Sequence, residues 1–205
     1  MARNEAKRYR RSGLDRTSRR IVDFVKAQGV EGRTVLEVGG GIGAIQIELL
    51  KAGASSAVSI ELSPTYEEVA HELLREAGLS DRVERKVMDF VEADGQVPAA
   101  DVVIMNRVIC CYHDMPRLAG AAADHAQHLL VMSYPRGSLW IRAALALMNF
   151  VLWITRRGFH VFVHPPMQIV ATAERHGLAP ALDQRGLLWT VSALRRTAGS
   201  TASAQ

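Results

Sequence analysis

Residues 34–50 read Thr-Val-Leu-Glu-Val-Gly-Gly-Gly-Ile-Gly-Ala-Ile-Gln-Ile-Glu-Leu-Leu, and this stretch decides the fold. Its first five residues are an apolar run broken only by Glu37, which is typical of a parallel strand buried on both faces. Four glycines follow, and apolar residues then return at helical spacing. The pattern predicts a strand, a tight turn and the first turns of a helix.

The glycines in this turn are Gly39, Gly40, Gly41 and Gly43. Glycine has no Cβ, so it allows a positive φ and a close approach of the backbone to a ligand. The free N–H groups at the start of the following helix suit an anionic or electron-rich group. The turn therefore predicts a site for a nucleotide-like cofactor, and a tight turn without any ligand is the alternative. The same residues also satisfy the dinucleotide pattern G-x-G-x-x-G/A, so the loop alone leaves NAD open.

Three acidic residues stand at or next to the ends of successive strand-like runs. Glu37 lies in the first run, Glu61 ends the run 57–61, and Asp89 follows the run 82–88. Ligands of open α/β sheets bind at the carboxyl ends of the strands. A carboxylate at position 61 can accept both ribose hydroxyls, which an NAD enzyme also needs. The acids predict one binding edge without choosing between the two cofactors.

The run Glu37-Val-Gly-Gly-Gly-Ile-Gly43 has the form E-x-G-x-G-x-G and resembles motif I of the class I S-adenosylmethionine-dependent methyltransferases. It departs from many members in having an additional glycine, Gly40, where they carry a larger residue, and in having Glu rather than Asp at position 37. The resemblance covers about residues 15–195 and implies that Glu37 helps to hold the amino acid end of S-adenosylmethionine. It also implies that Asp89 contacts the adenine amino group and that Phe90 packs against the ring. The cofactor-binding residues expected are Glu37, Gly39, Gly40, Gly41, Gly43, Glu61, Leu62, Asp89, Phe90, Asn106 and Arg107.

The order of the predicted strands and helices favours one of the two cofactors over the other. Strands are predicted at 57–61, 82–88, 101–105 and 128–132, with helices at 64–77 and 115–127 between them, so the sheet is parallel and joined by right-handed crossovers. A helix at 167–176 and two extended runs, 179–184 and 187–194, predict a terminal β-hairpin. A dinucleotide domain would continue with a parallel strand. The resemblance implies an α/β fold that is Rossmann-like and doubly wound: a seven-stranded sheet, mostly parallel with an antiparallel C-terminal hairpin strand, and helices on both faces.

Charge and length predict the domain organisation. The first 20 residues hold eight Arg or Lys and only two acids, Glu5 and Asp15. The net positive charge of this segment exceeds the formal charge of +4 of the whole chain. We expect a basic flexible tail at 1–13, a single domain at 14–196 and a flexible tail at 197–205. A lid over the cofactor or substrate is the alternative for residues 1–13. The body is not basic, so nucleic acid is an unlikely partner. The only cysteines are adjacent, and the N-terminus lacks the apolar core of a secretory signal, which favours the cytoplasm.

Residues 137–157 form a hydrophobic helical insert. Arg142 and Asn149 interrupt its apolar run, and both are costly in hydrocarbon, so a transmembrane span is not expected. A helix buried in the core, a cover over the substrate pocket, a homodimer face and contact with a membrane surface all stay open. In this family the segment after the fifth strand lies near the catalytic rim, so Trp140 is predicted to contact a hydrophobic or aromatic substrate.

The segment after the fourth strand, residues 106–114, occupies the place of the family's substrate-facing motif. His113 is the candidate general base, because imidazole titrates near neutrality, and a solvent-facing role is the alternative. Tyr112 and Tyr134 are candidates to orient the substrate, with core packing as the alternative. Cys110 and Cys111 are expected to be small buried apolar residues. No cluster of His, Cys or carboxylates has the spacing of a metal site, so no metal is expected.

The sequence therefore predicts an S-adenosylmethionine-dependent methyltransferase that acts on a small, lipophilic or aromatic acceptor, with O-methylation favoured. Motif I and the segment after the fourth strand are similar to those of the magnesium-protoporphyrin methyltransferase group. Asn106 is followed by Arg-Val-Ile rather than Pro-Pro-Tyr, which argues against methylation of base amino groups in nucleic acids. An RNA or protein methyltransferase guided by the basic tail, and a non-catalytic cofactor-binding module, are the alternatives.

Overall fold

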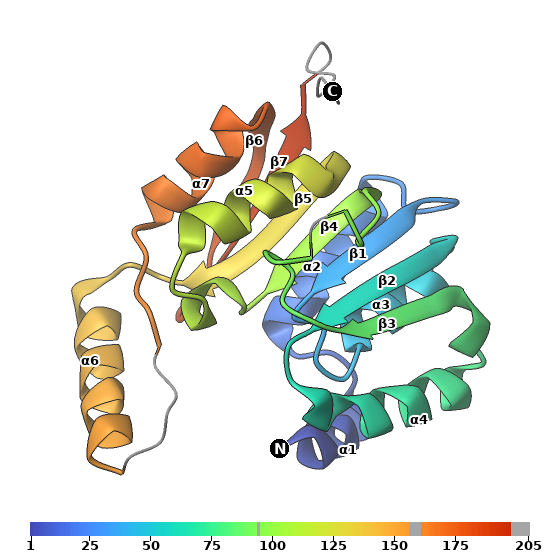
Figure 1. The fold of residues 1–205 in the computed structure, drawn as a ribbon, viewed down its shortest axis with the longest axis horizontal. Coiled ribbons are helices and arrows are strands. Elements are labelled where there is room, and N and C mark those ends of the chain that lie inside the picture. Colours follow the sequence, from blue (N-terminus) through green and yellow to red (C-terminus); the bar gives the residue numbers. More distant parts are fainter. Residues whose placement is uncertain (94, 156–160, 198–205) are drawn as a thin grey trace.

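The computed structural model describes residues 1–93, 95–155 and 161–197. One seven-stranded sheet has the strand order β3-β2-β1-β4-β5-β7-β6 (Figure 1). The strands are β1 Thr34–Val38, β2 Ser56–Glu61, β3 Val83–Val87, β4 Ala100–Asn106, β5 Ala126–Pro135, β6 Leu178–Arg185 and β7 Trp189–Arg196. The helices are α1 Ala2–Ser12, α2 Arg16–Ala27, α3 Ala44–Lys51, α4 Glu67–Ala77, α5 Met115–His125, α6 Leu139–Ile154 and α7 Pro166–Arg175, with short 3-10 turns η1 Pro64–Tyr66, η2 Ser80–Arg82 and η3 Ile109–Cys111.

The pairing of the strands confirms the predicted topology. Strands β1 to β5 pair in parallel, and β7 runs antiparallel to both β5 and β6. Val38 at the end of β1 is level with Ile60 on one side and Met105 on the other. The carboxyl ends of three neighbouring strands therefore meet at one edge of the sheet, where ligands of such sheets bind.

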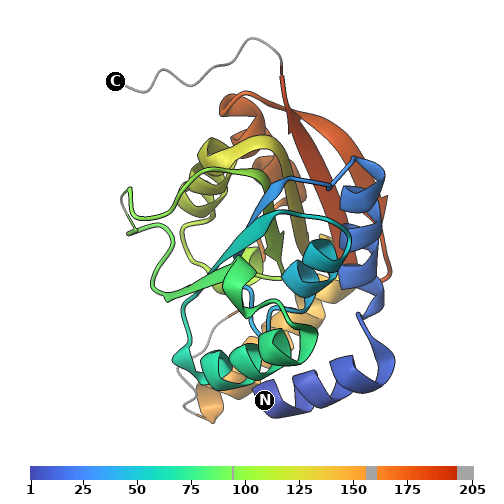
Figure 2. The same cartoon turned by 90° about the vertical axis from the view of Figure 1, so that its right-hand side faces the viewer.

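Two hydrophobic cores lie on the two faces of the sheet. Because side chains alternate along a strand, Val35 packs with α2, α3 and α4, whereas Leu36 packs with α5 and α7 on the opposite face. Both views show helices on the two sides of one curved sheet (Figures 1 and 2). The prediction of helices on both faces is confirmed. Several boundaries differ by a few residues: for example, α5 ends at His125 rather than at residue 127, and Ala126 already pairs with Ala100 as the first residue of β5.

The prediction of a flexible tail at 1–13 is wrong, because residues 2–12 form α1. Ala2 and Ala6 are buried, and the Tyr9 hydroxyl donates a hydrogen bond to Glu48 at 2.6 Å. Arg10 forms an ion pair with Glu76 of α4, also at 2.6 Å. Figure 2 shows α1 beside α4 at the lower end of the molecule. Two small alanines and a tyrosine at helical spacing form the packing stripe, and the abundant arginines concealed it in the sequence. Residues 198–205 of the predicted C-terminal tail lie outside the described residues.

Helix α6 projects away from the body of the domain (Figure 1). Ile141 is its only buried residue. The alternative of a helix buried in the core is therefore wrong. Residues 156 and 157 of the predicted insert lie outside the described residues. Among the described residues, no helix has both the length and the hydrophobicity required to span a bilayer.

Candidate cofactor and acceptor site

The glycine loop between β1 and α3 is held close to its neighbours. Gly39 donates its backbone N–H to the carbonyl of Ile60 at 2.7 Å, and its φ is +68°. A Cβ added to Gly39 would collide with the side chain of Val108, and one added to Gly40 would collide with the Ser59 hydroxyl. Gly41 and Gly43 also have positive φ. The loop requires glycine for both backbone conformation and space, as the sequence predicted.

Arg85 of β3 fixes the outer side of this loop. Its guanidinium donates to the carbonyl of Gly41 at 2.9 Å and to the Ser59 hydroxyl at 3.1 Å, and it pairs with Glu67 at 2.7 Å. Its side chain is only 1% exposed. Sequence reasoning missed this residue, because Glu84 and Lys86 flank it and charged residues in a strand are usually exposed. The available signal was an arginine within a strand next to the strand that ends in Glu61.

Glu37 lies buried beneath the loop, with 3% of its surface exposed. Burial raises the pKa of Glu37 to about 8, although the nearby Arg85 guanidinium opposes the shift. Its Oε2 atom has no hydrogen-bond partner among the described residues. A buried acceptor of this kind is costly unless something donates to it. The site thus offers a carboxylate for a cationic or donor group.

We expect Glu37→Gln to stabilise the cofactor-free protein at alkaline pH. The pKa of Glu37 is higher in the folded state than in the unfolded state, so its stabilising protonated form is fully present at low pH and is lost as pH rises through about 8. Glutamine stays neutral, so the variant should gain roughly 3–5 kcal/mol over wild type at about pH 9 and very little near pH 4.5. Urea unfolding across this range measures the difference. A gain that does not depend on pH would contradict the assignment, and the exposed Glu84→Gln is the matched control.

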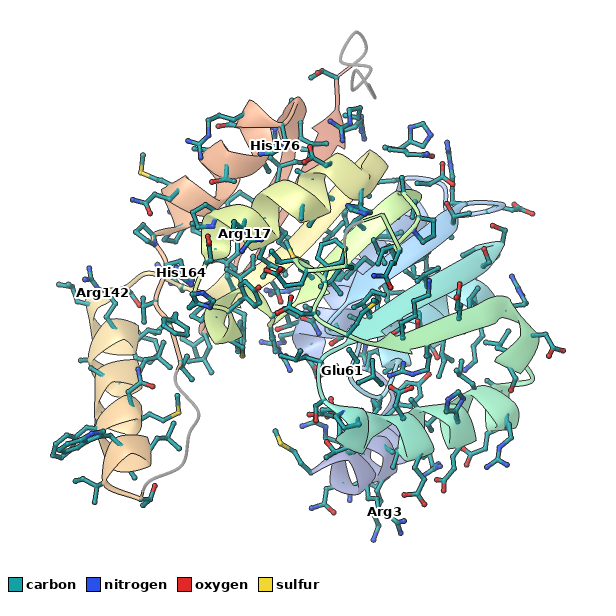
Figure 3. All side chains as sticks on the ribbon, in the orientation of Figure 1. Arg3, Glu61, Arg117, Arg142, His164 and His176 are labelled. Carbon is teal, nitrogen blue, oxygen red and sulfur yellow. The ribbon has the colours of Figure 1, made fainter. Side chains whose placement is uncertain are left out.

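Glu61 joins the end of β2 to the glycine loop. Its two carboxylate oxygens accept the backbone N–H groups of Gly41 and Ser63, each at 2.9 Å. The backbone carbonyl of Glu61 accepts the N–H of Met88 at 3.1 Å, which brings Asp89 alongside. Figure 3 shows Glu61 at the edge of the sheet that faces α1 and α4. The structure therefore gathers the predicted acids at one edge. Leu62, which was also predicted to bind the cofactor, is 64% exposed there.

Asp89 has a partner that the sequence did not predict. The Tyr112 hydroxyl donates to its carboxylate at 3.2 Å, and the backbone N–H of Val91 donates at 2.9 Å. Burial raises the pKa of Tyr112, and the neighbouring Asp89 charge raises it further. Phe90 is 6% exposed and meets the ring of His125 edge-on, at 5.1 Å between centroids. Phe90 therefore anchors the loop in the core beneath Asp89.

Asn106 and Arg107, at the end of β4, are tied to the start of α2. The Asn106 amide donates to Ser18 at 3.2 Å and accepts from Ser133 at 2.7 Å. Arg107 has the left-handed φ of 63°, and its guanidinium donates to Asp15 at 2.6 Å. Burial alone would raise the pKa of Asp15, but Arg107 and the hydrogen bonds of the N-cap hold it below its usual value. A strained backbone at this position is typical of functional sites.

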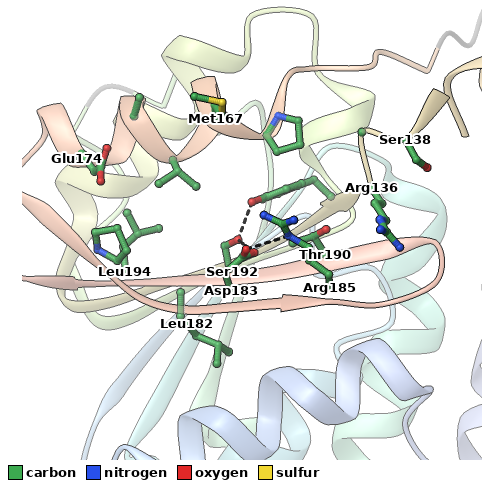
Figure 4. Close-up of a pocket in the computed structure, with 17 residues that line it drawn as sticks. Arg136, Ser138, Met167, Glu174, Leu182, Asp183, Arg185, Thr190, Ser192 and Leu194 are labelled. Carbon is green, nitrogen blue, oxygen red and sulfur yellow. Dashed lines mark hydrogen bonds and ion pairs between the residues drawn. The ribbon is translucent and has the colours of Figure 1, made fainter.

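The four residues predicted to act on the acceptor, His113, Tyr112, Tyr134 and Trp140, lie in different surroundings. His113 is exposed, and its ring stacks on Tyr112 at 5.3 Å. Tyr134 is buried, and its hydroxyl shares a hydrogen bond with Ser192 at 2.6 Å. It lines a cavity of about 650 Å³ between α7 and the β6–β7 hairpin (Figure 4). Trp140 is 52% exposed on α6 and is not among the residues that line this cavity.

An aromatic rim borders the segment after β4. The chain returning from α6 donates the N–H of Phe162 to the carbonyl of Cys110 at 2.8 Å, and His164 Nε2 lies 3.0 Å from the carbonyl of Tyr112. The rings of Phe162 and His164 stack at 5.9 Å. Cys110 is buried as expected, but Cys111 is exposed, so the expectation of two buried thiols is wrong for Cys111. Sequence reasoning missed this rim, since the contacting segments are about 50 residues apart.

The residues present fit a sulfonium nucleoside that also carries an ammonium group. The buried Oε2 atom of Glu37, which has no donor among the described residues, suits a cationic or donor group, and the glycine loop leaves room that side chains would fill. Glu61 is fixed at the end of the second strand. Glu5 of α1, which the sequence did not single out, is half-buried and interacts electrostatically with Glu61 and Arg107. Burial raises the pKa of Glu5, and the arginines nearby oppose that shift.

Comparisons with known proteins agree with this fit. A family model described as a methyltransferase domain matches residues 6–195. Magnesium protoporphyrin IX methyltransferase from Synechocystis, crystallised with bound SAH, superposes with a TM-score of 0.72 at 17% identity, covering 88% of this chain and 82% of that one. An O-methyltransferase family protein from Burkholderia thailandensis superposes with a TM-score of 0.74 at 24% identity, covering 91% and 58%. These likenesses show the fold.

A curated relative is the ribosomal protein L11 methyltransferase of Enterobacter sp., which is 27% identical over 135 residues. The match covers 66% of this chain and 42% of the relative, so the chain spans less than half of that protein's length. The seven-stranded fold and the glycine loop are thus those of a methyltransferase domain. The chain belongs to the family of methyltransferase domains.

Proposed function

We propose that the protein transfers the methyl group of S-adenosylmethionine to an oxygen atom of a small, lipophilic or aromatic acceptor. The observation that supports this choice is the aromatic rim after β4. It consists of the stacked pairs Tyr112–His113 and Phe162–His164, and the Tyr112 hydroxyl donates to Asp89 at 3.2 Å. Flat rings favour stacking with an aromatic acceptor.

The bound cofactor supplies an electrophilic methyl carbon. An acceptor oxygen forms the new bond to that carbon, the carbon–sulfur bond breaks, and the sulfonium becomes a neutral thioether. The protein aligns the two reactants and excludes water. Glu37, Glu61 and Asp89 hold the cofactor in this proposal, and Arg107 positions the start of α2 through Asp15. The acceptor proton passes to a base, for which His113 is the candidate.

We expect His113→Ala to lower kcat by about 100-fold on a phenolic acceptor, while the Kd of the cofactor stays within about twofold. Loss of a general base affects the chemical step, whereas the acids proposed to hold the cofactor, Glu37, Glu61 and Asp89, lie in or just after β1, β2 and β3. Single-turnover rates of the wild type and the variant measure this step. A change in kcat of only a few-fold would remove His113 from catalysis. His71→Ala, an exposed histidine on α4, is the matched control.

A second candidate function is methylation of a ribosomal or other basic protein. The specific observation is the likeness to ribosomal protein L11 methyltransferases. Incubation of the enzyme and labelled cofactor with ribosomal proteins and, separately, with a panel of phenols and hydrophobic acids distinguishes the two. Label in a protein band without turnover of any small acceptor would replace the first proposal by the second.

A further inference from the structure

Helix α6 exposes more apolar surface than any other part of the described chain. Eight of its large side chains are between 39% and 81% exposed: Leu139, Trp140, Leu147, Met148, Phe150, Val151, Trp153 and Ile154. Monomeric soluble proteins rarely expose a contiguous apolar patch of this kind. The helix is also anchored in its position, because Asn149 donates to the carbonyl of Val161 at 2.7 Å and accepts its N–H at 2.9 Å.

The exposed apolar surface extends around most of the helix. At 100° per residue, the protein-facing positions 141, 145, 149 and 152 span a narrow stripe, and the exposed apolar positions cover an arc of about 220°. A partner helix or a groove covers a stripe little wider than about 100°. A continuous apolar medium covers the whole arc. The width of the surface therefore favours the acyl region of a lipid layer over a second protein.

The charges around α6 fit an anionic lipid surface. The sequence contains no Asp or Glu between Asp124 and Glu174, whereas the same interval contains four arginines. Arg136 precedes the helix and Arg142 lies in it, and both are exposed. Trp140 and Trp153 lie near the two ends of the helix, and Trp prefers the depth of the lipid headgroups. Basic residues beside an apolar helix attract anionic lipids.

The length of α6 limits how deeply it can enter a membrane. Its 16 residues give about 24 Å, which is shorter than the hydrocarbon core of a bilayer. Its two ends are joined to the same domain, through Pro135 at the end of β5 and through Val161. A helix of this length, joined to the domain at both ends, can enter only one leaflet of a bilayer, with its protein-facing stripe directed toward the domain. Figures 1 and 2 also place the strongly basic α1 at the same lower end of the molecule as the end of α6.

We propose that α6 binds the surface of a membrane that contains anionic lipids, with its exposed apolar arc in the outer part of one leaflet. This inference rests on α6 and its charges and does not depend on the proposed acceptor. The arginines contact phosphate groups of the lipids, and the apolar side chains contact the acyl chains.

Co-sedimentation of the full chain with vesicles tests the proposal. The protein should bind vesicles of phosphatidylglycerol and phosphatidylcholine in equal parts, and bind pure phosphatidylcholine more weakly. The triple variant Leu147→Glu, Phe150→Glu, Trp153→Glu should lose binding by more than about tenfold. Arg136→Gln with Arg142→Gln should remove the preference for the anionic vesicles. The control Met167→Glu with Leu187→Glu changes two apolar side chains outside α6 that are at least as exposed, and it should bind like wild type.

Two further readouts distinguish lipid binding from self-association and from loss of folding. Brominated lipids should quench the tryptophan fluorescence of the wild-type protein. They should quench that of the double variant Trp140→Phe, Trp153→Phe much less. Cofactor affinity should be unchanged in the triple variant, which shows that the domain is folded. Equal sedimentation of wild type and triple variant would overturn the proposal. A wild-type dimer that ignores vesicles and dissociates in the triple variant would also overturn it, and would identify α6 as an interface between two copies of the chain.

Discussion

Replacing Glu61 by Ala is expected to weaken binding of S-adenosylhomocysteine by about 100-fold, because a buried carboxylate then no longer accepts hydrogen bonds from the ligand or from the loop. Glu61 accepts the N–H groups of Gly41 and Ser63, so its loss also releases the glycine loop. Glu61→Gln keeps one acceptor oxygen, but its NH2 group cannot accept the other backbone N–H and the charge is lost, so an intermediate loss of about tenfold is expected. Isothermal titration calorimetry measures both affinities.

The matched control for this series is Glu84→Ala. Glu84 belongs to the neighbouring strand β3, is exposed and pairs only with Lys86 in the described structure, so the affinity should not change. Thermal unfolding of each variant checks that the domain is intact. If Glu61→Ala bound the product as tightly as wild type, the carboxylate would not belong to the cofactor site and the role assigned to β2 would be wrong.

Gly39→Ala is the second change with a large expected effect. Its φ is +68°, and its Cβ would collide with Val108, so the loop and the chain after β4 cannot both keep their positions. We expect a loss of roughly 2–4 kcal/mol in the free energy of unfolding and no detectable turnover. Urea unfolding and a methyl-transfer assay measure the two effects.

Two companion variants separate backbone strain from collision. Gly78 has a φ of +67° and open space around its Cβ position, so Gly78→Ala should cost only about 1 kcal/mol from the backbone alone. Val108→Ala combined with Gly39→Ala removes the colliding methyl groups and should recover most of the excess. If Gly39→Ala and Gly78→Ala were equally destabilising, close approach to Val108 would play no part in the loop.

The topology could be predicted from the sequence because its signals are local. Continuous apolar runs, the glycines after Val38 and the turn at Arg185-Gly186 each predict an element from neighbouring residues. The position of each acid at a strand end followed from the same runs. Once the strands are parallel and adjacent, those ends meet, so the gathering of Glu37, Glu61 and Asp89 needed no further information.

The contacts that complete the site depend on segments far apart in the chain. The Tyr112–Asp89 and Arg107–Asp15 pairs join such segments, and each forms only when the sheet brings its partners together. The same holds for α1, where alanines at helical spacing become a packing stripe only because α4 lies beside them. For α6 the difficulty is the reverse: its composition is that of a buried helix, but the described domain covers only one stripe of it.

The central claim is that the glycine loop and the three acids form a socket for S-adenosylmethionine. The most direct test is isothermal titration calorimetry of the wild-type protein with S-adenosylhomocysteine and, separately, with NAD. We expect S-adenosylhomocysteine to bind at one site per chain with a Kd in the micromolar range or tighter, about −8 kcal/mol, and NAD to give no heat beyond dilution. Tight binding of NAD without any heat from S-adenosylhomocysteine would contradict the account.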